Sequence, residues 1–369
     1  MANRSTYKNK ITGAGTLTAY CVTEKGTNYY ATRTPVQCDF SNFEGTLVAT
    51  SSLDDPSVLR FTLDTSSGMP KGTMNIGSNV EVQNSGKTFR IGKLTGSGAL
   101  GGGCTFSNGA SVGANTWQIG NDANWGCSVK VTSNSNFVKL GTGKVTWSGV
   151  STNTGTTTIK EGELCLSATG KLGTGKLTVA QGATFSGTNL TTKQLENASV
   201  EVNGTLRPGS YNGAFSGTLF FGGKNVTLNQ SAVFVVGTNK CATASANGCT
   251  TLQNIGTLTI NGTIRIEPVS SNTLAVGDSI RLWSNVTKFV GTPTIEGTNG
   301  IEWDASRISE GLLFVKSIAT GIKPQIADTK TQIGNIYDLR GRLVRQSATS
   351  TEGLKPGIYV IEGRKFVVK

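Results

Sequence analysis

The chain has 369 residues, of which 49 are glycine and none is histidine. The lack of histidine excludes Ser-His-Asp and Cys-His catalytic pairs, an imidazole general base and a His-ligated metal. Charged residues make up only 15% of the chain, which argues against a long helical or coiled-coil protein. The net charge of +12 comes with no basic helix and no run of Lys and Arg, so we expect no nucleic-acid binding.

Short alternating segments dominate most of the chain. Apolar residues alternate with Thr, Ser or Lys over a few positions, and each segment ends at Gly or Asn-Gly. Period 2 with β-branched residues predicts strands, and the intervening Gly and Asn permit the positive φ of tight corners. We therefore predict an all-β protein, with strands at 15–20, 45–50, 128–132, 144–149, 156–168, 176–187, 200–206 and 256–268.

Two segments of this pattern return along the chain. GTLTA at 15–19 returns as GTLVA at 45–49, an offset of 30, and LGTGKVTW at 140–147 returns as LGTGKLTV at 172–179, an offset of 32. A single unit cannot bury its apolar face, whereas stacked units pair equivalent strands about 4.8 Å apart and enclose an apolar column. The echoes favour a right-handed parallel β-helix, that is, a β-solenoid; a β-sandwich is the competing fold.

Residues 140–187 carry glycines and apolar residues in a characteristic order. In that order the segment resembles the autotransporter-associated β-strand repeat, although Asn153 is followed by Thr154 where the family usually has an aromatic residue. The resemblance implies a parallel β-helical passenger of a secreted or surface protein in Gram-negative bacteria, and it transfers no catalytic residue. The matching positions are Gly141, Gly143, Gly149, Gly155, Thr157, Ile159, Gly162, Leu164, Leu172, Gly173, Gly175, Leu177, Val179 and Gly182.

Residues 274–315 resemble the segment that closes such repeat regions. This resemblance rests on Trp303, Asp304, Ser306, Gly311 and Val315. We expect the segment to cover the open end of the apolar column, with the large rings of Trp283 and Trp303 as its plug.

The composition changes after Thr320. Residues 321–369 hold nine Lys and Arg against four acids, a net charge of +5, and they show four short strands with hairpin spacing. This tail resembles the C-terminal sorting domain of type IX secretion in Bacteroidetes, which implies an exported protein. The residues that define the predicted sorting tail are Tyr337, Leu339, Gly341, Gly357, Tyr359 and Lys365.

These patterns divide the chain into five parts. We predict divergent solenoid coils over 1–130, autotransporter-type repeats over 131–270, a cap over 271–318, a linker over 319–332 and a small antiparallel β tail for sorting or anchoring over 333–369.

The seven cysteines include no C-x-x-C pair, so zinc ribbons and thioredoxin chemistry are not expected. Cys241 and Cys249 bracket a small polar loop and form the predicted disulfide. The alternative is that all seven are small hydrophobic residues. Weaker candidate pairs are Cys21–Cys38 and Cys104–Cys127, with Cys165 left as a thiol.

Aromatic residues and carboxylates are the candidate site residues. Trp117 and Trp125 are predicted to contact a glycan, whereas Trp147 stands where the echo has Val179 and is assigned to the core. No carboxylate pair recurs from coil to coil, so we predict no catalytic residue, no metal and no cofactor. The carboxylates weighed for glycan cleavage are Asp54, Asp55, Asp122, Glu161 and Glu163.

The resulting functional hypothesis is an exported or cell-surface passenger with a structural, adhesin-like role. The alternatives are the non-catalytic C-terminal part of a larger secreted polysaccharide-degrading enzyme and a glycan-binding solenoid. Expected partners are the secretion machinery or the outer-membrane surface, with extracellular glycans or a host surface as further candidates, and we expect a monomer. The first 15 residues lack the apolar core of a signal peptide, so such a signal would precede Met1.

Overall fold

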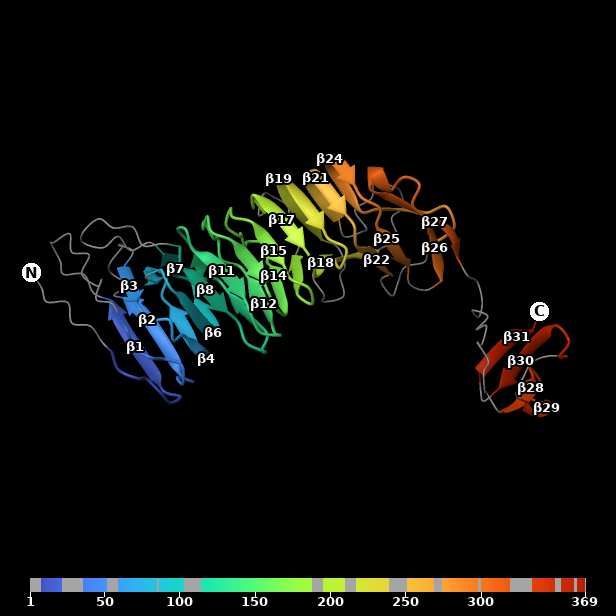
Figure 1. Ribbon diagram of the computed structural model, residues 1–369, viewed down its shortest axis with the longest axis horizontal. Helices are drawn as coiled ribbons and strands as arrows, with labels where there is room; N and C mark the ends of the chain where they lie inside the picture. Colours follow the sequence, from blue (N-terminus) through green and yellow to red (C-terminus); the bar gives the residue numbers. More distant parts are fainter. Residues whose placement is uncertain are drawn as a thin grey trace, which may run out of the picture.

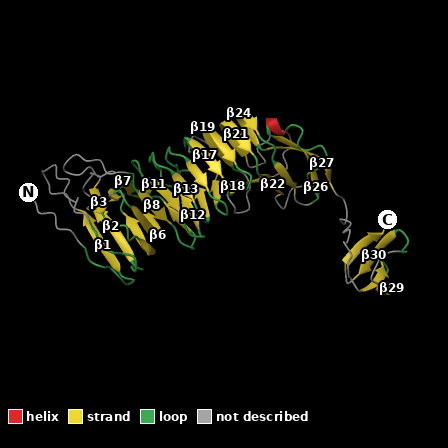
Figure 2. Ribbon diagram, viewed as in Figure 1, coloured by secondary structure: helices red, strands yellow, loops and turns green. Residues whose placement is uncertain are grey.

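The computed structural model describes residues 8–21, 36–51, 59–84, 86–102, 114–187, 195–209, 217–238, 251–268, 274–297, 300–318, 334–348, 353–361 and 364–368. Over these ranges the protein is all-β, with 31 strands and a single 3-10 helix, η1 (Ile308–Glu310). The strands follow one another along an elongated solenoid (Figures 1 and 2). The predicted β-solenoid fold is confirmed.

One face of the solenoid is a twelve-stranded sheet in which every neighbouring pair is parallel. Its strands follow chain order, as expected when each coil adds one strand to the growing edge. They are β1 (Thr16–Cys21), β2 (Thr46–Ser51), β4 (Met69–Ile76), β6 (Thr88–Gly96), β8 (Thr116–Ile119), β11 (Asn136–Lys139), β13 (Thr157–Ile159), β15 (Leu177–Val179), β17 (Ser199–Val202), β19 (Thr218–Leu228), β21 (Thr251–Ile260) and β24 (Trp283–Val290).

Two further parallel sheets complete the coils. The four-stranded sheet contains β3 (Leu59–Leu63), β5 (Val80–Asn84), β7 (Ala99–Gly102) and β10 (Lys130–Val131). The eight-stranded sheet contains β9 (Trp125–Cys127), β12 (Lys144–Trp147), β14 (Glu163–Leu166), β16 (Thr184–Gly187), β18 (Thr205–Pro208), β20 (Val233–Thr238), β22 (Thr263–Pro268) and β25 (Thr294–Gly297).

The interior is one continuous apolar column, because strand alternation sends every second side chain inward and the parallel register stacks equivalent positions. Leu47 pairs with Met74 and Met74 with Leu94, and all three are buried. Farther along, the ring centroids of Phe137 and Trp147, from two different sheets, lie 4.9 Å apart. Contacts of this kind hold the opposing faces together.

The two sequence echoes have different structural meanings. Thr16 pairs with Thr46, so the 30-residue echo joins equivalent strands of successive coils. The 32-residue echo does not, because Val145 lies in β12 of the eight-stranded sheet and Leu177 lies in β15 of the twelve-stranded sheet. The interpretation of this echo as one coil is wrong: a Gly-rich corner followed by a short strand suits either face.

Coil length changes along the solenoid. The paired residues Phe137 and Thr157 are 20 positions apart in the sequence, as the hydrogen-bonded Asn136 and Thr156 are, whereas the paired residues Thr218 and Thr251 are 33 apart. Gly120 shows how little room the short coils leave at a corner, since its φ is +135° and a Cβ there would lie 1.8 Å from the Leu140 carbonyl oxygen. Only glycine avoids both the strained φ and the clash.

Near the end of the column, a three-stranded antiparallel sheet is formed by β23 (Ser279–Arg281), β27 (Leu312–Ile318) and β26 (Ile301–Asp304). Trp283 is buried and stacks on Phe289 with a centroid distance of 5.0 Å. Trp303 packs against the same core. Both rings therefore contribute to the apolar core at this end of the solenoid.

The tail is a separate four-stranded antiparallel sheet in the order β29-β28-β30-β31. Its strands are β28 (Gly334–Asp338), β29 (Leu343–Ala348), β30 (Gly357–Ile361) and β31 (Arg364–Val368). The predicted small antiparallel β tail is therefore present. Between β28 and β29, Gly341 has a φ of +78° and donates its backbone N–H to the Asp338 carbonyl at 3.0 Å.

Candidate functional site

The two tryptophans predicted to contact a glycan lie in the core. Trp117 is 0% exposed, and its indole Nε1–H donates to the Gly101 carbonyl at 3.1 Å. Trp125 is 9% exposed. Their strand partners are the buried residues Phe137 and Val145, so the register places both rings inward. The prediction of an exposed aromatic platform is wrong; the assignment of Trp147 to the core is confirmed, because its side chain is fully buried.

The carboxylates considered for catalysis bond to neighbouring coils. Asp122 Oδ1 accepts from the backbone N–H and the hydroxyl of Thr142, at 3.1 and 2.9 Å, and these bonds lower the pKa of Asp122. Glu163 accepts from the Ser186 hydroxyl at 2.6 Å and pairs with Lys144 at 3.2 Å. The bonds of Asp122 and Glu163 therefore link neighbouring coils, and the low pKa of Asp122 makes that carboxyl a poor proton donor.

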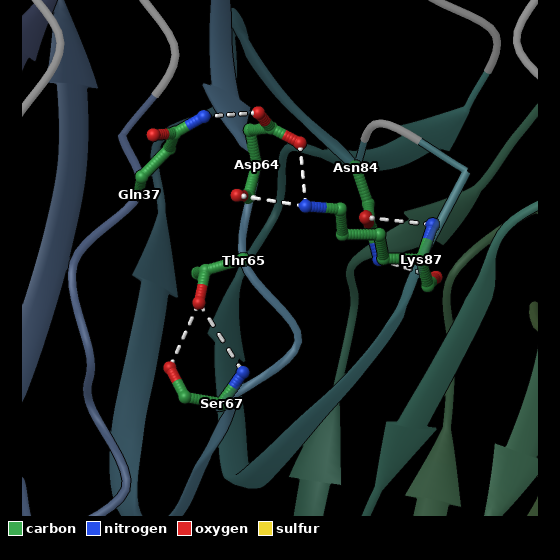
Figure 3. Close-up of polar contacts among 6 residues, drawn as sticks. All are labelled: Gln37, Asp64, Thr65, Ser67, Asn84 and Lys87. Carbon is green, nitrogen blue, oxygen red and sulfur yellow. Dashed lines mark hydrogen bonds and ion pairs between the residues drawn. The ribbon is translucent and has the colours of Figure 1, made fainter. Parts of the chain in front are cut away.

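Asp64 is a further link of this kind, in the earlier coils (Figure 3). The Gln37 side-chain amide donates to its Oδ2 at 2.5 Å, and the Lys87 ammonium lies 2.9 Å from its Oδ1. Asn84 then closes a short turn, donating to the Lys87 carbonyl at 2.7 Å. Both oxygens of Asp64 are therefore engaged by residues from other coils.

Within the described ranges, no group of three or more Cys, Asp or Glu has the geometry to hold a metal ion. Asp54 and Asp55 lie outside the described residues.

Lys139 is a buried cation that the sequence analysis missed. It ends β11, is 0% exposed, and its ammonium donates to the carbonyls of Leu140, Gly141 and Glu161 at 2.8, 2.8 and 3.2 Å. Burial lowers the pKa of Lys139 to about 8, opposed by the nearby Glu161 carboxylate. The segment NFVKLG shows no signal for this role, because lysine on a short strand normally indicates an outward position.

The described cysteines are core residues. Cys127 is a buried free thiol, so the candidate pair Cys104–Cys127 is wrong, and Cys165 is a buried free thiol, as expected for the unpaired residue. Cys38 is also buried. The predicted Cys241–Cys249 disulfide and the side chain of Cys21 lie outside the described residues.

We predict that Cys127 and Cys165 do not react with iodoacetamide in the folded chain at neutral pH. Burial raises the pKa of Cys127 to about 12 and also raises that of Cys165, so the reactive thiolate is scarce at both. Peptide mass spectrometry should find both thiols unlabelled in buffer and labelled in urea. Labelling of Cys127 without denaturant would contradict its placement in the core.

The tail sheet has one packed face and one open face. On the packed face Ile336 is fully buried. Residues that pair directly across antiparallel strands lie on the same face of the sheet, so the pairing identifies the members of the other face. Tyr337 pairs with Val360 and with Leu343, Val360 pairs with Lys365, and Ile358 pairs with Val367. We call this set the open tail face: Tyr337, Leu343, Ile358, Val360, Lys365 and Val367.

Aliphatic side chains of the open tail face remain in contact with solvent. Leu343 is 50% exposed, Ile358 40% and Val367 38%. A small isolated sheet rarely buries enough apolar surface to need no partner. The signal in the sequence is the period-2 spacing of Ile358 and Val360, which places both side chains on one face of the strand.

The predicted sorting residues have mixed roles in this sheet. Tyr337 and Lys365 belong to the open tail face. Tyr359 points to the other face and donates its hydroxyl to the Lys355 carbonyl at 2.9 Å, which closes the turn before Gly357. Leu339 follows β28 and is 57% exposed.

No family model matches the chain, and no curated protein matches it. In the part of the chain that the structure describes, no helix is long and apolar enough to cross a membrane.

Proposed function

We propose that this protein is an exported or cell-surface β-helical passenger with a structural, adhesin-like role and no catalysis of its own. The single observation that carries the proposal is the continuous solenoid with an apolar interior, in which the candidate carboxylates are used to join coils. A rod of stacked coils is rigid along its axis and projects a surface away from its point of attachment. Catalysis would require convergent groups around a substrate.

In this proposal the tail is the sorting signal that directs export. It is a separate small sheet with an open apolar face and an excess of Lys and Arg, which suits an element that docks elsewhere. Its likeness to type IX sorting domains, and that of residues 140–187 to autotransporter-associated repeats, supports an origin in Bacteroidetes and delivery to the exterior of the outer membrane. The burial of Trp117 and Trp125 removes the residues on which glycan binding was based.

Deletion of residues 334–369 in the native organism is expected to abolish surface exposure of the protein while leaving the solenoid folded. The deletion removes only the tail sheet, whose strands pair with one another and with no solenoid strand. Protease accessibility on whole cells, together with fractionation, measures the location. The thermal transition of the purified truncated chain is the control for folding and should match that of the full chain.

Surface exposure of the truncated protein would show that the tail is not the sorting signal. A cytoplasmic location of the full-length protein would contradict export altogether.

A further inference from the structure

The open tail face combines exposed aliphatic side chains with one cation, Lys365, and none of its members is an acid. In the described tail residues the sequence holds six Lys and Arg but one acid, Asp338. Asp338 is already engaged, because Arg342 Nε lies 2.8 Å from its Oδ2. On the open face itself, Lys365 is exposed beside Val360, and Ile358 and Val367 lie next to them in register.

We propose that the open tail face docks on a lipid surface that carries anionic phosphate headgroups. This inference rests on the proposed function of the tail and names the surface that it contacts. Aliphatic side chains would enter the boundary between headgroups and acyl chains, while Lys and Arg lie at the level of the phosphates. The excess of Lys and Arg over acids in the described tail residues suits an anionic partner of this kind.

The composition of the face separates this occupant from two others. A second copy of the chain would bring the same basic tail, and the two would repel one another. A protein groove is usually filled by Trp, Tyr or Arg anchors, whereas the exposed hydrophobic members of this face are Leu343, Ile358 and Val367, and its one aromatic residue, Tyr337, is only partly exposed. Aliphatic side chains beside a lysine suit the chemistry of a lipid headgroup layer better than that of a specific protein pocket.

The test is sedimentation of the purified full-length chain with vesicles. One set contains phosphatidylcholine alone, and the other contains equal parts of phosphatidylcholine and phosphatidylglycerol. We expect partitioning into the anionic vesicles only, weakening as salt is raised, because screening acts on the Lys and Arg contacts. Lys365→Glu should lower the partition coefficient by roughly 30-fold at low salt, since it reverses one charge at the surface.

Two further variants distinguish binding through the open tail face from attraction due to the net charge of the whole chain. Lys130→Glu makes the same charge change at an exposed residue of the solenoid and should leave partitioning unchanged. Ile358→Asn keeps the charge but should reduce partitioning several-fold, because it removes an aliphatic contact. Circular dichroism of each variant checks that the chain still folds.

The proposal is overturned if the chain ignores anionic vesicles, or if Lys130→Glu weakens partitioning as much as Lys365→Glu does. Binding of the tail to a protein, with no binding to either kind of vesicle, would also overturn it. None of these outcomes decides whether the tail directs export, because the deletion experiment measures that separately in cells.

Discussion

Replacement of Trp147 by alanine is expected to lower the free energy of unfolding by about 3–5 kcal/mol. The ring is fully buried in the apolar column, and its centroid lies 4.9 Å from that of Phe137 on the opposing sheet. Alanine would leave a cavity between the two faces that neighbouring coils cannot close without moving their own backbone ladders. Urea unfolding followed by circular dichroism measures the loss.

Trp147→Phe is the matched control. It keeps an aromatic ring against Phe137 and forfeits no polar contact, because the indole nitrogen of Trp147 has no hydrogen-bond partner in the described structure. The phenylalanine variant should therefore lose less than half as much stability as the alanine variant. Equal, small losses in both variants would show that the column is not packed around this position.

Lys139→Met is expected to destabilise the protein by about 2 kcal/mol at pH 7. The methionine keeps most of the volume but leaves the carbonyls of Leu140, Gly141 and Glu161 without the ammonium that they accept from. Part of that loss is offset because the variant no longer buries a charge. The free energy of unfolding from urea titrations of both proteins measures the balance.

We also expect the difference in stability between the native chain and Lys139→Met to depend on pH. The folded-state pKa of Lys139 is lowered to about 8 from the usual 10.5. Below pH 8 the residue is charged in both states and contributes no slope, whereas between pH 8 and 10.5 the unfolded chain binds more protons than the folded one. Stability of the native chain relative to Lys139→Met should therefore rise across this window, by up to about 3 kcal/mol.

The contributions of the other groups that titrate at high pH cancel in the difference between the unfolding free energies of the two proteins. Cys127 alone would act in the opposite direction, since its folded pKa is raised to about 12 and stability is lost as the unfolded thiol ionises. A difference that stays flat from pH 8 to 10.5 would show that the three carbonyls hold the pKa of Lys139 near its usual value.

Much of the architecture could be predicted because it depends on local pattern. Alternation with β-branched residues specifies strands, and Gly at the corners specifies where the chain bends. Hence the solenoid, and the four strands of the tail, agree with the sequence. The pairing of Thr16 with Thr46 shows that the register between two successive coils could also be predicted, from the 30-residue repeat.

The candidate residues were harder to place, because burial depends on register rather than on residue type. Trp117 and Trp125 suit either a glycan platform or a core, and only their pairing with Phe137 and Val145 decides that they face inward. Lys139 is the converse case. Its charge indicates an outward position, yet carbonyls from its own corner and the next coil converge on its ammonium.

The sequence by itself determined the all-β class, the stacking of coils and the basic, strand-rich tail, since these follow from periodicity and composition. Only the tertiary structure decided which face each strand joins, how long each coil is and which tail residues stay open to solvent. The LGTGK motif leads into strands of two different sheets, and in both places it forms a Gly-rich corner before a short strand. Its place in the coil depends on how many residues the preceding corners consume, which is a property of long-range pairing.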